Sequence, residues 1–340
     1  MGGGEIHLLN TGGTISYAAD GSGLTWSPES FLADIDVPAR VVYREVLRKA
    51  SINLTPADWE TIAAAVHEAL RAEADGVVVL HGTDTMAYTA AALSFMLQDL
   101  SVPVVLTGAM RRGGTADGDG RQNLANALVV AARGDLAEVC LVFSSDEQGR
   151  SGVILRGNRI RKRHSGALGA FASPNHPPLG VVAEGRVRLE SARVARGSRG
   201  EPRYAPGIDP NVRSIRYHPG CTPGFVAETL AGADGAVVEG TGLGHVATDG
   251  ELLEAIRRAG KPVALVSACW EGGVHLGGYD VDHEILAVEN IVPGDDMTPE
   301  TALVKLMWVL ARERALDRVR ARMQEPIAGE LTRRRAIASE

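Results

Sequence analysis

The chain has 340 residues, of which 45% are hydrophobic and 23% are charged, and its 42 acidic and 35 basic side chains give a formal net charge of −7. This length is enough for about two domains with sizeable cores, and the near-average composition excludes a disordered chain. No apolar run approaches the roughly 18 residues of a membrane span, and the acidic balance gives no general attraction to nucleic acid or anionic lipid.

Short β-branched runs alternate with longer segments of helical period in the first half of the chain. This alternation is typical of a buried parallel sheet covered by helices. In the first expected helix, Trp59, Ile62 and Val66 share one face. In chain order the expected strands are residues 5–10, 76–81, 102–106, 137–143 and 152–155, and the expected helices are 56–74, 84–99 and 121–133.

The second half of the chain repeats the alternation after a break. Residues 180–217 are polar and rich in Arg, Gly and Pro, without a clear period, so we place the domain boundary there. We expect an N-terminal domain at 1–190, a linker at 191–213 and a smaller C-terminal α/β domain at 214–340. The strands expected beyond the boundary are 214–218, 235–239 and 262–268, and the helices are 222–232, 249–260 and 298–316.

The first expected strand runs into Thr11-Gly12-Gly13-Thr14-Ile15. In open α/β sheets the carboxyl ends of the strands are where ligands bind. Adjacent glycines let the backbone turn sharply and present N–H groups, and a threonine hydroxyl can serve as a nucleophile. The alternative is a tight turn whose threonines cap backbone groups.

A second polar cluster, His81-Gly82-Thr83-Asp84-Thr85, follows another expected strand. Thr and Asp are preferred helix N-caps, so capping alone explains part of it. The density of polar residues at a second carboxyl strand end favours a site.

A basic run, residues 159–164, contains the single lysine Lys162. Such a run is either a solvated loop, a weak anion patch or the setting for one buried lysine, which can act as a proton acceptor where arginine cannot. Residues 240–245 resemble a dinucleotide loop, but His245 occupies the place of the last glycine of G-x-G-x-x-G.

We expect no metal and no organic cofactor. The three cysteines, Cys140, Cys221 and Cys269, lie far apart, and H-E-x-x-H, G-x-S-x-G and Walker motifs are absent. The first residues carry no basic region followed by an apolar one, which is consistent with a cytoplasmic protein that binds neither membrane nor nucleic acid.

Together, the motifs at 11–15 and 81–85 resemble the two signatures of the bacterial-type L-asparaginase and glutaminase family. The likeness continues through Ser51, residues 103–111, the run holding Lys162 and residues 298–310, so it covers nearly the whole chain. It implies an α/β, two-domain asparaginase-like fold with a larger N-terminal parallel-sheet domain. It also implies homodimers or homotetramers with active sites between subunits. Several stretches look most like the glutaminase subunit of archaeal glutamyl-tRNA amidotransferase, a member of the same family.

The resemblance implies a role for each matched residue. Thr14 would be the nucleophile, and Lys162 would draw its proton away through Thr83. Asp84 would orient Lys162 and bind the substrate's ammonium. The residues implied in substrate binding are Gly13, Ser51, which grips the α-carboxylate, Gly82 and, from a partner subunit, Asp280.

Two positions depart from the family pattern. Between residues 16 and 31 the only tyrosine is Tyr17, too close in sequence to Thr14 to be the family's loop tyrosine, and Ile52 stands where relatives carry a polar side chain. We expect hydrolysis of L-asparagine to L-aspartate and ammonia, with weak glutaminase activity. The alternatives are an ammonia-supplying subunit of a tRNA-dependent amidotransferase and an amidase for a modified amide.

Overall fold

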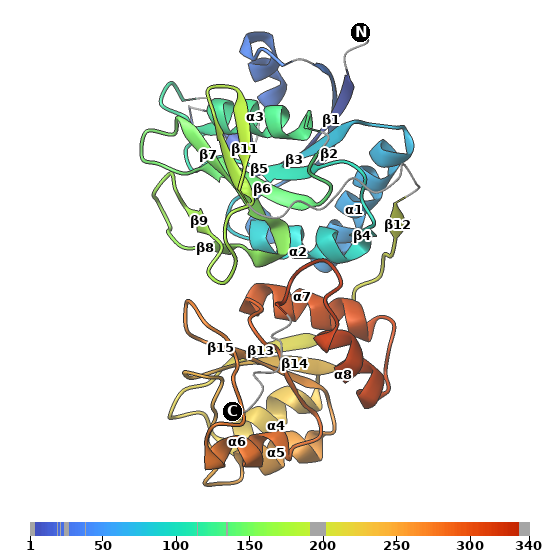
Figure 1. Cartoon of the computed structure of the whole chain (residues 1–340), viewed down its shortest axis with the longest axis vertical. Coiled ribbons are helices and arrows are strands. Elements are labelled where there is room, and N and C mark those ends of the chain that lie inside the picture. The colour runs from blue at the N-terminus through green and yellow to red at the C-terminus, as the bar shows by residue number, and fades with distance from the viewer. Residues whose placement is uncertain are drawn as a thin grey trace. The chain divides into compact units, whose positions relative to one another are not determined.

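The computed structural model describes residues 4–332 except 19, 21, 24–26, 38, 114, 134 and 191–201. The chain divides into two units, Met1–Pro206 and Gly207–Glu340 (Figure 1). The first eleven residues of the expected linker, 191–201, lie outside the described part. Within the remainder of that segment, strand β12 (Arg203–Tyr204) pairs antiparallel with strand β4 (Leu97–Gln98) of the first unit.

An eight-stranded sheet forms the centre of the first unit, in the order β11-β10-β7-β6-β5-β3-β1-β2. The five strands from β2 to β6 in this order are parallel, while β7, β10 and β11 are antiparallel to their neighbours. The strand bounds are β1 Gly4–Gly12, β2 Ala39–Lys49, β3 Gly76–Leu80, β5 Val104–Thr107, β6 Val139–Ser144, β7 Ser151–Arg156, β10 Gly180–Ala183 and β11 Arg186–Leu189.

All five strands expected in this half are confirmed, and the sheet is mostly parallel, with an antiparallel part that begins at β7. Only residues 145–150 connect β6 to β7. A parallel neighbour needs a crossover of about a dozen residues or more, so this connection returns the chain antiparallel.

Three strands of this sheet are not predicted by the sequence patterns. The edge strand β2 has one neighbour and only exposed or half-buried residues, with Arg40, Arg44 and Arg48 on it, so it lacks the apolar run of a buried strand. Strands β10 and β11 lie in the polar stretch without a clear period. Their two-residue turn, Glu184-Gly185, has positive φ at both positions, the geometry of a tight hairpin.

Helices cover both faces of this sheet. Helix α3 (Gly120–Ala131) packs on one face, and α1 (Pro56–Arg71) and α2 (Met86–Met96) pack on the other (Figure 1). Trp59, Ile62 and Val66 of α1 are buried, which confirms its expected apolar face. Helix α2 is shorter than expected because residues 97–98 leave it to form β4.

The register of the parallel strands builds the core under α3. Val78 of β3 lies between Leu8 of β1 and Val105 of β5, and all three are fully buried in one apolar cluster. Leu124 and Leu128 of α3 pack into the same cluster. Removing this apolar surface from water is the main stabilising contribution, about 25 cal/mol for each Å² buried.

A second, wholly parallel sheet in the order β13-β14-β15-β16 organises the other unit. Its expected strands and helices are confirmed, except that the helix expected at 298–316 ends at Leu310; the sequence patterns did not predict α6, β16 or α8. Where α7 ends, the Arg312 side chain donates to the Trp308 carbonyl of its last turn at 2.7 Å. The bounds are β13 Val212–Arg216, α4 Pro223–Ala231, β14 Gly235–Gly240, α5 Leu252–Ala259, β15 Val263–Ser267, α6 Asp280–Leu286, β16 Ile291–Pro293, α7 Pro299–Leu310 and α8 Leu316–Gln324.

None of the described helices is both long and apolar enough to cross a bilayer.

Candidate active site

The first glycine-rich turn is held by hydrogen bonds on both sides. Strand β1 ends at Gly12, and Thr14 opens the short 3-10 helix η1 (Thr14–Ser16). The buried Asn10 Oδ1 accepts the Gly12 N–H at 3.0 Å and the Ser16 hydroxyl at 3.3 Å. These bonds fix the turn that presents Thr14, whose side chain is half-buried.

Three segments meet at glycines with no room for a side chain. Gly13 has φ of 84°, and a Cβ there would lie 2.3 Å from the Gly82 nitrogen. A Cβ on Gly82 would lie 2.6 Å from the Ser51 Oγ. Gly13, Gly82 and Ser51 are therefore in close contact, and any larger residue at either glycine separates the segments that carry Thr14, Ser51 and Thr83.

The second polar cluster is joined to the basic run by hydrogen bonds. Lys162, in strand β8 (Arg161–Lys162), donates from Nζ to Thr83 Oγ1 at 2.8 Å and to Asp84 Oδ1 at 2.7 Å. Strand β8 pairs with β9 (Phe171–Ala172), and the Lys162 side chain is 18% exposed. Lys162 is therefore not part of a solvated loop.

Helix capping does not account for this cluster. Thr85 is the N-cap of α2, but its side chain caps no helical N–H group; its hydroxyl donates instead to the Ser51 carbonyl at 2.9 Å. Thr83 and Asp84 are engaged with Lys162. The Thr83 hydroxyl and the Asp84 carboxylate therefore form a hydrogen-bonded group with Lys162 and do not cap the helix.

A fully buried histidine lies behind this turn. Burial lowers the pKa of His81 from 6.5 to about 4. In the neutral ring Nδ1 donates to the Gly82 carbonyl at 2.7 Å, because a carbonyl only accepts, and Nε2 accepts the Thr89 hydroxyl at 2.8 Å. His81 thereby fixes the peptide between Gly82 and Thr83.

The depressed pKa of His81 predicts an acid-sensitive fold. Unfolded His81 takes up a proton near pH 6.5 and folded His81 only near pH 4, so the unfolded state binds more protons in between. The free energy of unfolding therefore falls as the pH drops from 6.5 to 4, by at most about 3 kcal/mol. Urea denaturation of the wild type and His81→Asn at pH 7.5, 6 and 5 checks this, with the exposed His164→Asn as the matched control. Equal pH dependence in all three proteins would contradict it.

A pocket of about 260 Å³ opens where these segments meet. It brings together six of the eight residues expected at the site, and a seventh, Lys162, is hydrogen-bonded to two of them. The lining residues are Gly13, Thr14, Tyr17, Ala50, Ser51, Ile52, Gly82, Thr83, Asp84 and Arg112.

Three of these lining residues, Tyr17, Ala50 and Arg112, were not expected in the site. Tyr17 is so close to Thr14 in sequence that it was not expected to be the family's loop tyrosine. In the turn after Thr14, the Tyr17 N–H donates to the Thr14 carbonyl, and Tyr17 lines the pocket. Arg112 comes directly after residues 103–111, a stretch that carries the family likeness, and this position was the available signal for it.

The eighth expected residue, Asp280, belongs to the other unit. It is exposed and is the first residue of α6. The buried carboxylate of that helix is Asp282. Burial alone would raise its pKa, but N–H groups of residues 277–279 and His245 Nε2, at 2.7 Å, hold the pKa of Asp282 at about 2.

Among the described residues, no group of three or more His, Cys, Asp or Glu side chains is arranged to hold a metal ion.

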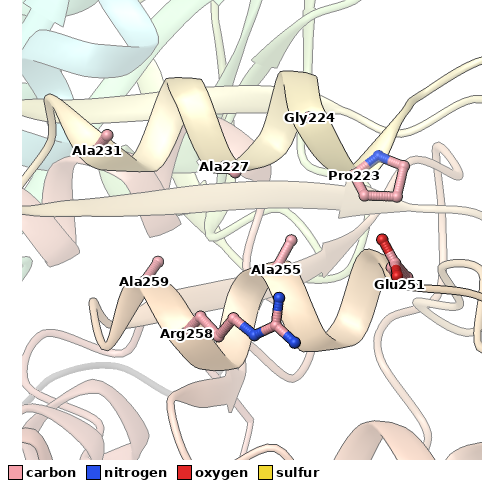
Figure 2. Close-up of a pocket in the computed structure, with 8 residues that line it drawn as sticks. All are labelled: Pro223, Gly224, Ala227, Ala231, Glu251, Ala255, Arg258 and Ala259. Atoms are coloured by element: carbon pink, nitrogen blue, oxygen red, sulfur yellow. The ribbon is translucent and has the colours of Figure 1, made fainter.

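A larger pocket of about 390 Å³ lies between α4 and α5 in the second unit (Figure 2). Its walls are mostly small residues, among them Ala227, Ala231 and Ala255, with Glu251 and Arg258 as the charged ones. None of its lining residues offers a hydroxyl or thiol nucleophile. Chemistry, rather than size, makes the 260 Å³ pocket the candidate active site.

Two family profiles match this chain. The profile described as "Asparaginase, N-terminal" matches residues 5–195, and that described as "Glutaminase/Asparaginase C-terminal domain" matches residues 211–323.

Individual relatives are similar over nearly the whole chain. An L-asparaginase of Thermococcus kodakarensis is 38% identical over 96% of this chain and 99% of that protein. A glutamyl-tRNA(Gln) amidotransferase subunit of Halobacterium salinarum is also 38% identical, over 96% of this chain and 79% of that protein.

Solved structures agree with these matches. The thermostable L-asparaginase from Thermococcus kodakarensis superposes with a TM-score of 0.89 at 36% identity, covering 97% of this chain and 100% of that one. L-asparaginase I from Vibrio cholerae gives a TM-score of 0.85 at 34% identity, covering 97% and 99%.

Proposed function

The chain belongs to the asparaginase family of amidohydrolases, and from this premise we propose that it converts L-asparagine and water into L-aspartate and ammonia. One observation carries the proposal. Thr14 lines the same pocket as Thr83 and Asp84, and the last two are hydrogen-bonded to Lys162. The similarity to L-asparaginases in sequence and structure supports asparagine as the substrate.

In the proposed reaction, the Thr14 hydroxyl attacks the side-chain amide carbon of asparagine. Its proton passes through the Thr83 hydroxyl to Nζ of Lys162 in the amine form, and returns to the leaving ammonia. Water then hydrolyses the ester on Thr14 by the reverse proton path. Backbone N–H groups at Gly13 and Thr83 stabilise the negative oxygen in both steps, at roughly 3 to 4 kcal/mol per donor in other acyl-transfer enzymes.

Substrate binding is assigned to Ser51, Gly13 and Gly82 in the pocket wall, with Asp280 added from a second copy of the chain. Asp280 is exposed and therefore available to such a partner. Large apolar side chains before it and along the same helix are also exposed: Tyr279 at 60%, Val281 at 37% and Leu286 at 43%. An exposed apolar surface of this kind supports a homodimer or homotetramer.

A second candidate function is supplied by the amidotransferase matches. In that role the same pocket releases ammonia for a tRNA-dependent amidotransferase. A third, an amidase for a modified amide, is favoured by Ile52, which lines the pocket and is 68% exposed. An apolar side chain there suits a substrate whose amino group is blocked.

Ammonia release by the pure chain from L-asparagine and L-glutamine, measured side by side, tests the proposal. We expect faster release from asparagine. If the folded protein released no ammonia from either amino acid, the proposal would be refuted. Recovery of a heteromeric complex from native extract, with activity only in the complex, would establish the amidotransferase role.

A further inference from the structure

One charged group in the pocket wall has no part in the proposed reaction. Asp84 and Arg112 are the two charged side chains among the lining residues, and Asp84 already pairs with Lys162. Arg112 adds a positive charge to the wall that also holds Ser51.

The backbone holds Arg112 in place on its N-terminal side. The buried Asp119 carboxylate accepts the N–H of Met110 at 3.0 and 3.1 Å and that of Arg111 at 2.9 Å. It is in turn held by the side-chain amide of Asn123 at 3.0 Å. A carboxylate that accepts two successive N–H groups sets the direction of the chain entering Arg112.

The C-terminal side of Arg112 is tied to the nucleophile itself. The Gly113 N–H donates to the Thr14 carbonyl at 3.2 Å. The Arg112 carbonyl accepts the Thr115 hydroxyl at 2.7 Å and the Thr115 N–H at 3.1 Å. Arg112 is therefore fixed relative to Thr14 by its backbone, without use of its guanidinium.

That guanidinium is available to a ligand. Within the described residues no ion pair joins it to a carboxylate, whereas the neighbouring Arg111 pairs with Asp117 at 3.3 Å. Its charge acts weakly on Asp20, whose pKa is lowered chiefly by hydrogen bonds from Ser22 and to a smaller degree by Arg112. Arg112 thus lines the pocket, and no described residue forms a hydrogen bond or ion pair with its guanidinium.

We propose that Arg112 is a further ligand of the substrate's α-carboxylate, beside Ser51 and opposite Asp84, to which the family resemblance assigns the α-carboxylate and the α-ammonium. This inference rests on the proposed function and deepens it. A guanidinium matches a carboxylate through two parallel N–H donors, and such charge-assisted pairs are about twice as strong as neutral ones. Opposite charges in one pocket select a zwitterion, and the amide of the side chain is then directed to Thr14.

The test compares Arg112→Met with the matched control Arg111→Met, using L-asparagine and its α-methyl ester, which lacks the carboxylate charge. We expect Arg112→Met to raise KM for asparagine about 10- to 100-fold with little change in kcat, and to leave KM for the ester nearly unchanged. Arg112→Lys keeps the charge and recovers part of the loss, and Arg111→Met behaves as wild type.

An unchanged KM for asparagine in Arg112→Met, or an equal loss for both substrates, would overturn the assignment. An inactive wild-type protein would overturn the proposed function instead. Calorimetric titration of L-aspartate into wild type and Arg112→Met still decides the role of Arg112 in that case, because binding of this α-carboxylate needs no turnover.

Discussion

Replacing Thr14 with Ala is expected to lower kcat for L-asparagine by at least about 1,000-fold, with little change in fold. The reason is chemical, because the methyl group of alanine offers no oxygen to form the ester with the substrate. Thr14 is half-buried and its hydroxyl makes no hydrogen bond to another described residue, so its removal costs little stability. Thr14→Ser keeps an oxygen and retains measurable turnover.

Thr11→Val is the matched control for this variant. Thr11 is the other threonine of the same turn, and its hydroxyl donates to the Leu80 carbonyl at 2.7 Å. Losing that buried bond costs about 1 to 3 kcal/mol of stability and leaves kcat near wild type. Steady-state ammonia release and mass spectrometry of the acylated protein separate the two variants. Activity in Thr14→Ala within tenfold of wild type would rule Thr14 out as the nucleophile.

Local patterns predicted the central part of the fold well. The runs at β3 and β6 are apolar without interruption, as strands buried on both faces must be, and they were found with errors of one or two residues. The edge strand β2 was missed because its single neighbour leaves charged residues exposed along it. Strand direction at β7 depended on loop length, which periodicity does not report.

The site was predictable in part for a similar reason. Thr14 and Thr83 lie in short polar motifs that follow expected strands, so the residues themselves single out these motifs, while the role of each threonine comes from the resemblance to a known family. No sequence pattern around Ser51 indicates a site, and Ser51 was identified only through the likeness to a known family. Its contact with Gly82 joins segments that are distant in sequence, so the contact is seen only in the structure. Arg112 directly follows residues 103–111, but the course of its loop depends on hydrogen bonds to the Asp119 carboxylate, and both Arg111 and Arg112 are exposed, so only the structure shows which of them lines the pocket.

Replacing Lys162 with Met is the second large effect, an expected fall in kcat of about 100- to 10,000-fold. In the proposed reaction Nζ receives the Thr14 proton through Thr83, and methionine cannot accept it. The structure places Nζ at 2.8 Å from Thr83 Oγ1, within the reach that a direct proton transfer requires. Stability is expected to change by less than about 1 kcal/mol, because the Asp84 partner is 60% exposed and water solvates it when the lysine is gone.

Lys162→Arg separates charge from proton acceptance. Arginine keeps a positive partner for Asp84 but stays protonated at any pH a protein tolerates, so a general-base role predicts that this variant is as inactive as Lys162→Met. If Lys162 acted only through its charge, Lys162→Arg would keep most of the wild-type kcat. Arg161→Met, a change of the neighbouring residue on β8, controls for disturbance of that strand. Measuring kcat, KM and Tm for the three variants therefore tells whether the lysine moves a proton or only holds Asp84 in place.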